Sequence, residues 1–405
     1  MIRYELPKRW ILYDARAVMA ALVETKSAVR TLTSLPFQKS WVEALQELQL
    51  KREVAGTSRI EGAEFTEREL DEAVRPNVTP EELLTRSQRQ AHAAMQAYRW
   101  IGELPADRPV SADLVREIHY LLVTGCDEDH CPPGVLRGRD YNVTFGIPPH
   151  RGAEGGPPCE EAFAGLLQAA QTEFRNHDPL IQALALHYHF AAMHPFLDGN
   201  GRTARALEAF MLRRAGLTDR AFIAMSNFYY DEKPVYLRIL SEVRHDGHDL
   251  TPFLIFALSG VRSQCERLTA EIRKQMQKAL FRDTMYSLFH RLKTKRKRVI
   301  GERQVEILKT LLDVEAIALD KLHVQVGRYY VPIKDPESAF YRDLDQLNSL
   351  RAIAIHQDLS NSDPFDWTAD FTVSINLDWP QEIDEGEFLR RMKSMPKGKT
   401  FKILS

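Results

Sequence analysis

The first 280 residues carry apolar side chains at helical spacing almost throughout, and this pattern constrains the fold more than any other feature of the chain. Leu114 and Ile118, for example, fall on one face of a helix. Capping-box spacing, a Ser or Thr followed three positions later by Glu, marks expected helix starts at Ser40, Thr66 and Thr79. Further helices are expected over about 159–175, 178–193, 201–214, 234–245 and 251–280. We therefore predict a mainly α-helical fold.

One stretch interrupts the helical pattern. Residues 131–158 are rich in Gly and Pro around a short β-prone run from Tyr141 to Phe145. Turn-forming residues on both sides of such a run are typical of a loop that carries a small hairpin. We expect a β-hairpin here, set into an otherwise helical core.

The pattern changes near residue 291, where six basic residues cluster within residues 291–298. We interpret this cluster as a helix end or linker. Beyond it we expect helices over about 302–313, 316–325 and 337–350, then strands over 352–356 and 371–375. This order is typical of a winged helix, an α+β fold. The expected domains are an N-terminal helical region (1–105), a catalytic core (106–280), the basic linker or helix end (281–300) and a winged-helix-like domain (301–405).

Composition excludes several classes of protein. The 405 residues hold 54 Lys and Arg against 56 Asp and Glu, so no global charge points to a nucleic-acid or membrane partner. No apolar run approaches the ~20 residues that a membrane-spanning helix needs, and the N-terminus does not resemble a signal peptide. Four cysteines are too few for a disulfide framework in a chain of this size. We expect a cytoplasmic protein without a membrane partner.

The chemistry is concentrated in the twelve residues His194-Pro-Phe-Leu-Asp-Gly-Asn-Gly-Arg-Thr-Ala-Arg205. The turn at residues 199–201 opens a helix, where free N–H groups and the positive end of the helix dipole attract anions. Arg202 and Arg205 lie three positions apart, so both guanidinium groups can reach one phosphate chain. Asp198 supplies a hard oxygen ligand for Mg²⁺, and His194 suits proton transfer near neutral pH. Together these groups predict a site for phosphoryl or nucleotidyl transfer.

This string matches the signature H-P-F-x-[DE]-G-N-G-R-x-x-R, and the chain resembles the Fic family over about residues 40–280. The resemblance implies a Fic-like helical core that transfers AMP from ATP to a Ser, Thr or Tyr hydroxyl of a target protein, and to the chain itself. It implies that His194 is the general base and that Asp198 holds Mg²⁺ against the α- and β-phosphates.

The same resemblance implies how the phosphates are held. The Gly199, Asn200 and Gly201 turn would cradle them, with the Asn200 side chain on the α-phosphate. Arg202 would neutralise the β- and γ-phosphates, and Arg205 the γ-phosphate. Phe196 is expected to pack the loop into the core.

Two further features are assigned less directly. In the family, a flap beside the active site pairs with the target segment like an added strand, and Tyr141, Asn142, Val143 and Thr144 are our flap residues. A surface hairpin without a function remains the alternative. Tyr229 and Tyr230 are aromatic candidates for contact with adenine, with core packing as an equal alternative.

A second motif lies upstream of the catalytic string. Residues 57–62, Thr-Ser-Arg-Ile-Glu-Gly, match the [ST]-x-x-x-E-[GN] inhibitory motif of the Fic family. A carboxylate at the end of a helix can form an ion pair with an arginine and occupy the space that a phosphate needs. The resemblance therefore implies that Glu61 pairs with Arg205 and inhibits the site. An ordinary solvated Glu at a helix end is the alternative.

Metal binding by other residues is not favoured. His187 and His189 lie two positions apart on a predicted helix, so they point to different sides and are expected to be structural. The loose spacing of Cys126 and Cys131, with Cys159 far along the chain, argues against a zinc site that would include His130. Cys265 falls within a helical pattern and is expected to pack in the core.

Alternative functions stay open at this point. The same site could remove AMP, with Glu61 orienting a water, or the core could sense nucleotide while the C-terminal domain binds DNA. DNA binding is not favoured, because the expected recognition helix carries Glu337, Asp343 and Asp345 against Arg342. A protein-interaction or dimerisation module is preferred, and a homodimer is left open.

Overall fold

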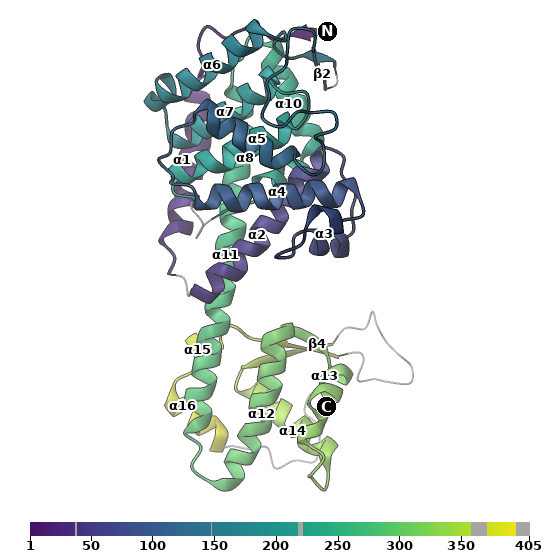
Figure 1. The fold of residues 1–405 in the computed structure, drawn as a ribbon. Coiled ribbons are helices and arrows are strands. Elements are labelled where there is room, and N and C mark those ends of the chain that lie inside the picture. Colours follow the sequence, from purple (N-terminus) through teal and green to yellow (C-terminus); the bar gives the residue numbers. More distant parts are fainter. Residues whose placement is uncertain (37–38, 147, 218–221, 358–370, 394–405) are drawn as a thin grey trace. The chain divides into compact units, whose positions relative to one another are not determined.

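The computed structural model describes residues 1–36, 39–146, 148–217, 222–357 and 371–393 (Figure 1). The chain divides into two compact units, Met1–Ala270 and Glu271–Ser405. Each unit has its own hydrophobic core. The fold is mainly helical, as predicted, and two small three-stranded sheets are present.

The first unit contains most of the helices. They are α1 (Ala15–Ser34), α2 (Lys39–Ile60), α3 (Glu67–Ala73), α4 (Arg86–Glu103), α5 (Ala112–Val123), α6 (Pro157–Gln171), α7 (Pro179–Met193), α8 (Asn200–Leu212), α9 (Met225–Asp231), α10 (Lys233–His245) and the start of α11 (Thr251–His290). Short 3₁₀ turns lie at Pro80–Glu82, Glu173–Asn176 and Arg213–Ala215.

Helix α7 is the centre of this unit. Every residue from Leu180 to Met193 is buried, so the helix is covered on all sides. Helix α8 packs against α7, and most residues of α8 are buried. The loop between α7 and α8 is therefore held at both ends by buried helices. The motif His194–Arg205 begins in this loop and ends in α8.

Capping decides where two of the expected helices begin. Thr66 forms the expected capping box with Glu69 at the start of α3. The helix expected at Thr79 is only a 3₁₀ turn, because the backbone becomes extended at Leu83. The α-helix starts later, where Thr85 and Gln88 form a second capping box at the start of α4. Ser40 lies outside the described side chains.

The expected hairpin is present, with shorter strands than the β-prone run. Strand β2 (Thr144–Phe145) pairs antiparallel with β3 (His150–Arg151), and β3 pairs parallel with β1 (Ile2–Arg3). The sheet order β1-β3-β2 leaves β2 at an edge. Residues before Thr144 form no strand because Arg137 holds the carbonyl of Tyr141 in a turn, with Nη1 2.8 Å from that oxygen.

The second unit contains α12 (Lys295–Val314), β4 (Ala316–Ala318), α13 (Leu319–Val326), α14 (Pro336–Ser349), β5 (Ile353–Gln357), β6 (Phe371–Ile375), α15 (Trp379–Glu382) and α16 (Glu385–Lys393). Strand β6 lies between β4 and β5 and pairs antiparallel with both. Residues 316–318 are a strand, whereas we expected the second helix to begin there. Helix α12 starts at Lys295, so the basic cluster extends into its first turn.

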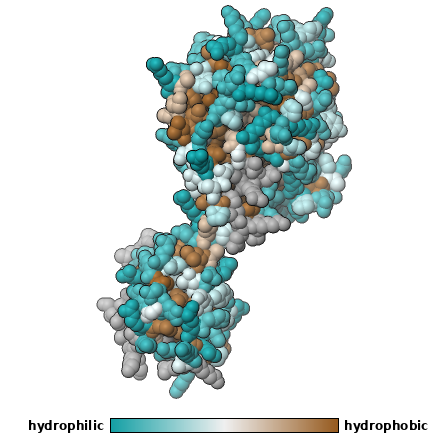
Figure 2. Space-filling model, turned by 90° about the vertical axis from the view of Figure 1, so that its left-hand side faces the viewer, coloured by the Kyte–Doolittle hydropathy of each residue, from teal (hydrophilic) through white to brown (hydrophobic). Residues whose placement is uncertain are grey.

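The surface is predominantly hydrophilic on the face shown in Figure 2, and apolar side chains form separate patches on it. Among the helices of the described residues, none has the length and apolarity that crossing a membrane requires.

Candidate active site

A single pocket brings together the motif residues, the hairpin, α10 and the end of α2. From the motif it is lined by His194, Asp198, Asn200, Gly201 and Arg205. The remaining lining residues are Ile60, Glu61, Phe145, Gly146, His150, Ala191, Tyr236, Leu237, Leu240, Ser241 and Arg244. Residues more than a hundred positions apart thus meet around the α7–α8 loop.

His194 ends α7 in the left-handed conformation, with φ of 55°. Its Nδ1 lies 2.9 Å from the carbonyl oxygen of Ala191. A carbonyl only accepts, so Nδ1 must carry the proton and Nε2 keeps its lone pair. Burial lowers the pKa of His194 to about 4, and the nearby Arg244 contributes to this shift. The imidazole is therefore neutral at physiological pH and can accept a proton through Nε2.

The hairpin covers this histidine. The ring of Phe145 in β2 stacks on the imidazole, with centroids 3.7 Å apart and an interplanar angle of 11°. The guanidinium of Arg244 lies over the Phe145 ring at 4.6 Å from its centroid. Neither residue was among the site residues expected from the sequence. Phe145 ended the β-prone run, but nothing in the sequence placed its ring on His194.

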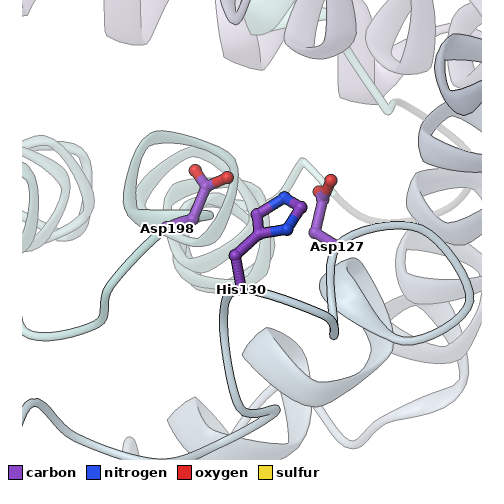
Figure 3. Close-up of side chains that lie close together, drawn as sticks. All are labelled: Asp127, His130 and Asp198. Carbon is purple, nitrogen blue, oxygen red and sulfur yellow. The ribbon is translucent and has the colours of Figure 1, made fainter.

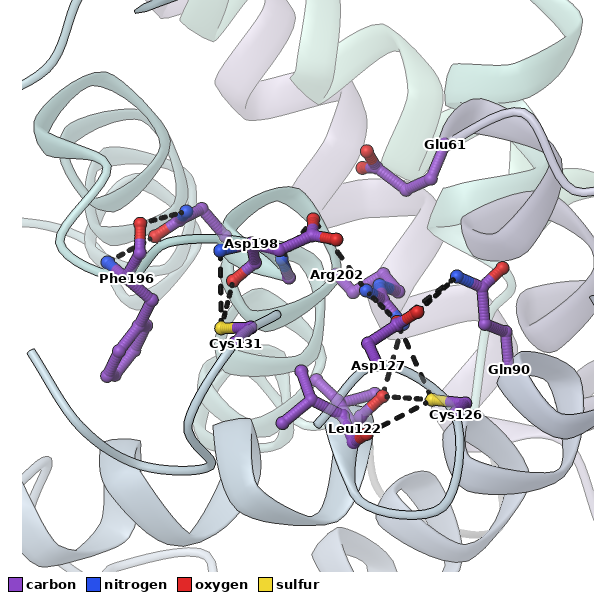
Figure 4. Close-up of polar contacts among 12 residues, drawn as sticks. Glu61, Gln90, Leu122, Cys126, Asp127, Cys131, Phe196, Asp198 and Arg202 are labelled. Carbon is purple, nitrogen blue, oxygen red and sulfur yellow. Dashed lines mark hydrogen bonds and ion pairs between the residues drawn. The ribbon is translucent and has the colours of Figure 1, made fainter. Parts of the chain in front are cut away.

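The turn after His194 is closed by Asn200. Its amide accepts from the backbone N–H of Phe196 and donates to the carbonyl of the same residue, both at 2.9 Å (Figure 4). The side chain that we expected on the α-phosphate is thus engaged in holding the loop. Gly199 has φ of 72°, which favours glycine. Phe196 is fully buried and stacks on His119 at 3.7 Å.

Asp198 is held through its backbone, which leaves the carboxylate accessible. His119 Nε2 donates to the Asp198 carbonyl at 3.0 Å, and Cys131 Sγ accepts from the Asp198 N–H at 3.3 Å. The side chain is 44 % exposed, and its nearest cation is Arg86, with Nη2 3.6 Å from Oδ2. An accessible carboxylate beside an anion-binding turn fits Mg²⁺ that also takes phosphate oxygens.

Arg202 is placed differently from the expectation. Its side chain is 2 % exposed, and Nη2 lies 2.6 Å from Oδ2 of Asp127. Nη1 donates to the carbonyl of Leu122 at 3.1 Å (Figure 4). Arg202 does not line the pocket, so it contributes positive charge from below the turn. Asp127 was missed because it lies in an irregular acidic segment after α5 that carries no periodic pattern.

Arg205 faces the pocket and contacts the end of α2. Its Nη2 lies 2.6 Å from Oε1 of Glu61, and its Nε donates to Oγ1 of Thr57 at 2.9 Å. Burial alone would raise the pKa of Glu61, but the charge of Arg205 lowers it below its usual value. A Cβ on Gly201 would overlap Glu61 Oε1. The glycine therefore makes room for the Glu61 carboxylate beside the phosphate turn.

Helix α2 is fixed against α9 just before Glu61. A Cβ on Gly56 would lie 2.5 Å from the backbone of Ser226 and Asn227, so only glycine allows this approach. Glu53 accepts hydrogen bonds from the Tyr98 hydroxyl and the Ser226 N–H, both at 2.8 Å. Burial raises the pKa of Glu53 to about 7. These contacts set the position of Glu61 relative to Arg205.

The two expected adenine contacts do not line the pocket. Tyr229 is fully buried, and its hydroxyl donates to Glu208 at 3.0 Å. Tyr230 is 37 % exposed and lies beneath the guanidinium of Arg59. The aromatic residue of this region that lines the pocket is Tyr236, whose hydroxyl lies 2.8 Å from His187 Nε2.

The expected flap residues lie just before and within β2. Tyr141 is 59 % exposed, Asn142 Oδ1 accepts from the Gly155 N–H at 3.2 Å, and the Val143 carbonyl accepts from the Gly152 N–H. Thr144 pairs with Arg151 in the sheet. The flap is thus anchored on one side, while its β2 strand is an edge.

Most of the histidines and cysteines discounted as metal ligands contact the core, whereas His130 is exposed and contacts Arg86. His187 contacts Glu208 and Tyr236, and His189 contacts the carbonyl of Trp10. Cys126 contacts the carbonyl of Leu122, and Cys159 that of Pro195. Cys265 is fully buried in α11.

Comparison with known proteins identifies the domain. Residues 109–212 match the model of the Fic/DOC family. These residues form a Fic domain within the chain. The Fic domain thus includes the flap, α7, the motif loop and α8.

Two curated relatives share the Fic domain. The protein adenylyltransferase Fic of Culex quinquefasciatus is 38% identical over 95 residues, which are 23% of this chain and 17% of that protein. The protein adenylyltransferase Fic of Nematostella vectensis is 31% identical over 105 residues, 25% of this chain and 23% of that protein. The matched segments span less than a quarter of either relative.

The fold extends beyond the matched segment. A crystal structure of a Fic family protein from Desulfovibrio desulfuricans G20 has a TM-score of 0.54 at 18% identity. It covers 92% of this chain and 98% of that protein. At this identity the likeness is one of fold.

Proposed function

We propose that this chain is a protein adenylyltransferase, which transfers AMP from ATP to a Ser, Thr or Tyr hydroxyl of a target protein. One observation carries the proposal. His194 presents an unprotonated Nε2 in the same pocket as the phosphate turn, Asp198 and Arg205. A base, an anion-binding turn and a cation around one cavity are what an in-line displacement at a phosphate requires. The two relatives named as adenylyltransferases support AMP as the group transferred.

Each residue has a role in this reaction. His194 Nε2 accepts the proton of the hydroxyl as its oxygen bonds to the α-phosphorus of ATP, and the bond from the α- to the β-phosphate breaks so that pyrophosphate leaves. The N–H groups at Gly199–Gly201 and the Arg205 guanidinium bind the phosphate oxygens, with Arg202 adding charge from beneath the turn. Asp198 would hold Mg²⁺, which would supply positive charge to the phosphates. The free edge of β2 pairs with the backbone of the target segment and so brings its hydroxyl to His194.

We propose that Glu61 inhibits this reaction. Its carboxylate lies on Arg205 and beside Gly201, where phosphate oxygens would otherwise be held. An anion in that position repels the terminal phosphates and removes Arg205 from them. Release requires that the end of α2 moves or that Glu61 leaves Arg205.

The test is incubation of the chain with ATP and Mg²⁺, alone and with candidate targets, followed by mass spectrometry. The expected result is a covalent AMP on a hydroxyl of the target or of the chain itself, and its absence with His194→Ala. Loss of AMP from a previously modified target, dependent on Glu61, would instead favour the reverse reaction. Folded wild-type and Glu61→Gly proteins that neither add nor remove AMP would refute the proposal.

We also propose that the second unit is a winged helix that binds protein rather than DNA. Helix α14 takes the place of a recognition helix in the element order, and half of its residues are buried. Asp343 and Asp345 are themselves buried, so the acidity that we expected on its surface is largely internal. Its exposed positions hold Glu337 and a single arginine, Arg342, so the helix presents little positive charge to the phosphates of DNA. Specific retardation of duplex DNA by the intact chain would refute this reading.

A further inference from the structure

The Arg86 guanidinium lies at the centre of a group of three metal-ligating side chains. Asp127, His130 and Asp198 each offer one ligand atom, and these atoms lie within 4.8 Å of one another. In Figure 3 the imidazole of His130 lies between the two carboxylates. Asp127 and His130 come from the segment after α5, and Asp198 comes from the motif loop.

One side chain contacts all three residues. Arg86 Nη2 lies 2.6 Å from Asp127 Oδ1, 3.2 Å from His130 Nε2 and 3.6 Å from Asp198 Oδ2. A guanidinium only donates, so His130 Nε2 presents its lone pair to Arg86. These are the two oxygens and the nitrogen lone pair that a divalent cation would take.

The other contacts of these residues orient the two carboxylates. Arg202 holds the opposite oxygen of Asp127, with Nη2 2.6 Å from Oδ2, and the Gly199 N–H holds Oδ1 of Asp198. Gln90 Nε2 also donates to both oxygens of Asp127, each at 3.1 Å, so Oδ1 of Asp127 is shared between Gln90 and Arg86. Such supporting hydrogen bonds are what positions metal ligands in proteins.

Arg86 is free to leave. It is the first residue of α4, and its side chain is 52% exposed, whereas that of Arg202 is 2% exposed. With Arg86 seated, two carboxylates face two guanidinium groups, and the local charge is balanced. When Arg86 swings into solvent, one negative charge is left over and a cation is attracted.

We propose that Asp127, His130 and Asp198 form a divalent-cation site, and that Arg86 occupies the cation position until the metal displaces it. The inference deepens the proposed function, because Asp198 is the residue that would hold the catalytic cation there. Arg86 then acts as a competing internal cation, separate from Glu61. The imidazole favours a first-row divalent ion such as Mn²⁺ over Ca²⁺.

The test is a titration of Mn²⁺ alone into the full chain, with the free ion measured by electron paramagnetic resonance. Arg86→Gln is expected to tighten binding about tenfold or more, which is about 1.4 kcal/mol, because it removes a positive charge that competes for the same ligand atoms. Arg89→Gln is the matched control. Arg89 lies one turn further along α4 and donates to the carbonyl of Leu83. It is expected to leave the affinity for Mn²⁺ unchanged.

A second variant tests the ligand set. His130→Ala in the Arg86→Gln background is expected to lose at least tenfold in Mn²⁺ affinity, because it removes one ligand. His130 is exposed on a loop, so the thermal melt is expected to stay unchanged. Unchanged Mn²⁺ affinity with Arg86→Gln, or full retention of the tighter binding with His130→Ala, would overturn the inference. Because the titration contains no nucleotide, a failure to transfer AMP would refute the proposed function and leave this result standing.

Discussion

Nη2 of Arg205 lies 2.6 Å from Oε1 of Glu61, although the two residues are 144 positions apart in the chain. The pair joins the residue that follows α2 to the second turn of α8, at the place where the motif loop would bind phosphate. Thr57, one turn before Glu61, accepts a second hydrogen bond from the same guanidinium. The contact is thus built into the packing of α2 and is not a chance surface pair.

Removing the Glu61 carboxylate is expected to tighten nucleotide binding. Glu61→Gly frees Arg205, and a charge-assisted hydrogen bond is worth about 1.5–3 kcal/mol. We predict that the affinity for ATP with Mg²⁺ rises about 10–100-fold, measured by isothermal titration calorimetry. Glu64→Gly, in an exposed position three residues on, is the matched control. Equal affinities for Glu61→Gly and the wild type would contradict the role given to the pair.

Adding a methyl group at Gly201 is expected to break the same contact from the other side. The new Cβ overlaps Glu61 Oε1, so Gly201→Ala must push the carboxylate away from Arg205. We predict a loss of about 1–3 kcal/mol in the free energy of unfolding, measured by chemical denaturation. In the Glu61→Gly background the same substitution should cost much less. An equal cost in both backgrounds would show that the clash lies elsewhere.

Loosening α2 from α9 should also release the site. Gly56→Ala places a Cβ 2.5 Å from the backbone of Ser226 and Asn227, and backbone cannot turn aside. We predict a lower melting temperature and faster AMP transfer than the wild type, since Glu61 moves with its helix. Gly327→Ala is the comparison, because a Cβ there meets no atom within 4 Å and its φ is −52°. If Gly56→Ala lowers the melting temperature but leaves the rate of AMP transfer unchanged, the packing of α2 on α9 does not control inhibition by Glu61.

The dependence of transfer on pH should reveal the environment of His194. Its pKa is lowered to about 4, chiefly by burial, so the imidazole remains unprotonated as the pH falls from 8 to 5.5. We predict that the rate of the Glu61→Gly protein at pH 5.5 stays within about twofold of that at pH 7.5. An ordinary histidine, with a pKa near 6.5, would by then be about nine-tenths protonated.

Phe145→Ala tests whether burial beneath the Phe145 ring lowers the pKa of His194. The substitution uncovers the imidazole, so the pKa of His194 should rise toward its usual value and the loss of rate should begin at higher pH. A pH profile that Phe145→Ala leaves unchanged would show that the ring does not control the protonation of His194.

Much of the fold and part of the site follow from local sequence. The helices around the motif follow from apolar periodicity, and the motif residues are near neighbours in sequence, so their clustering around one turn is unavoidable. Glu61 could be paired with Arg205 only through the resemblance to a family, since no local pattern joins residues 144 positions apart.

Three side chains lie elsewhere than the sequence led us to expect, and the physical reason is the same for each. Asn200 turns inward because the buried backbone of Phe196 needs both a donor and an acceptor. Arg202 turns toward Asp127 because a buried guanidinium requires a buried carboxylate. Tyr229 is drawn into the core by Glu208. In each case a tertiary partner determines where the side chain lies, and no sequence pattern marks that partner. The contact of Arg86 with Asp127 is likewise not marked by any sequence pattern.

The most direct test of the account is transfer of label from α-labelled ATP in the presence of Mg²⁺. It compares the wild type, Glu61→Gly and His194→Ala, each alone and with a cell lysate. We predict strong labelling of protein with Glu61→Gly, weak labelling with the wild type and none with His194→Ala. Equal labelling by the wild type and Glu61→Gly would contradict the inhibition, and labelling that survives His194→Ala would contradict the active site itself.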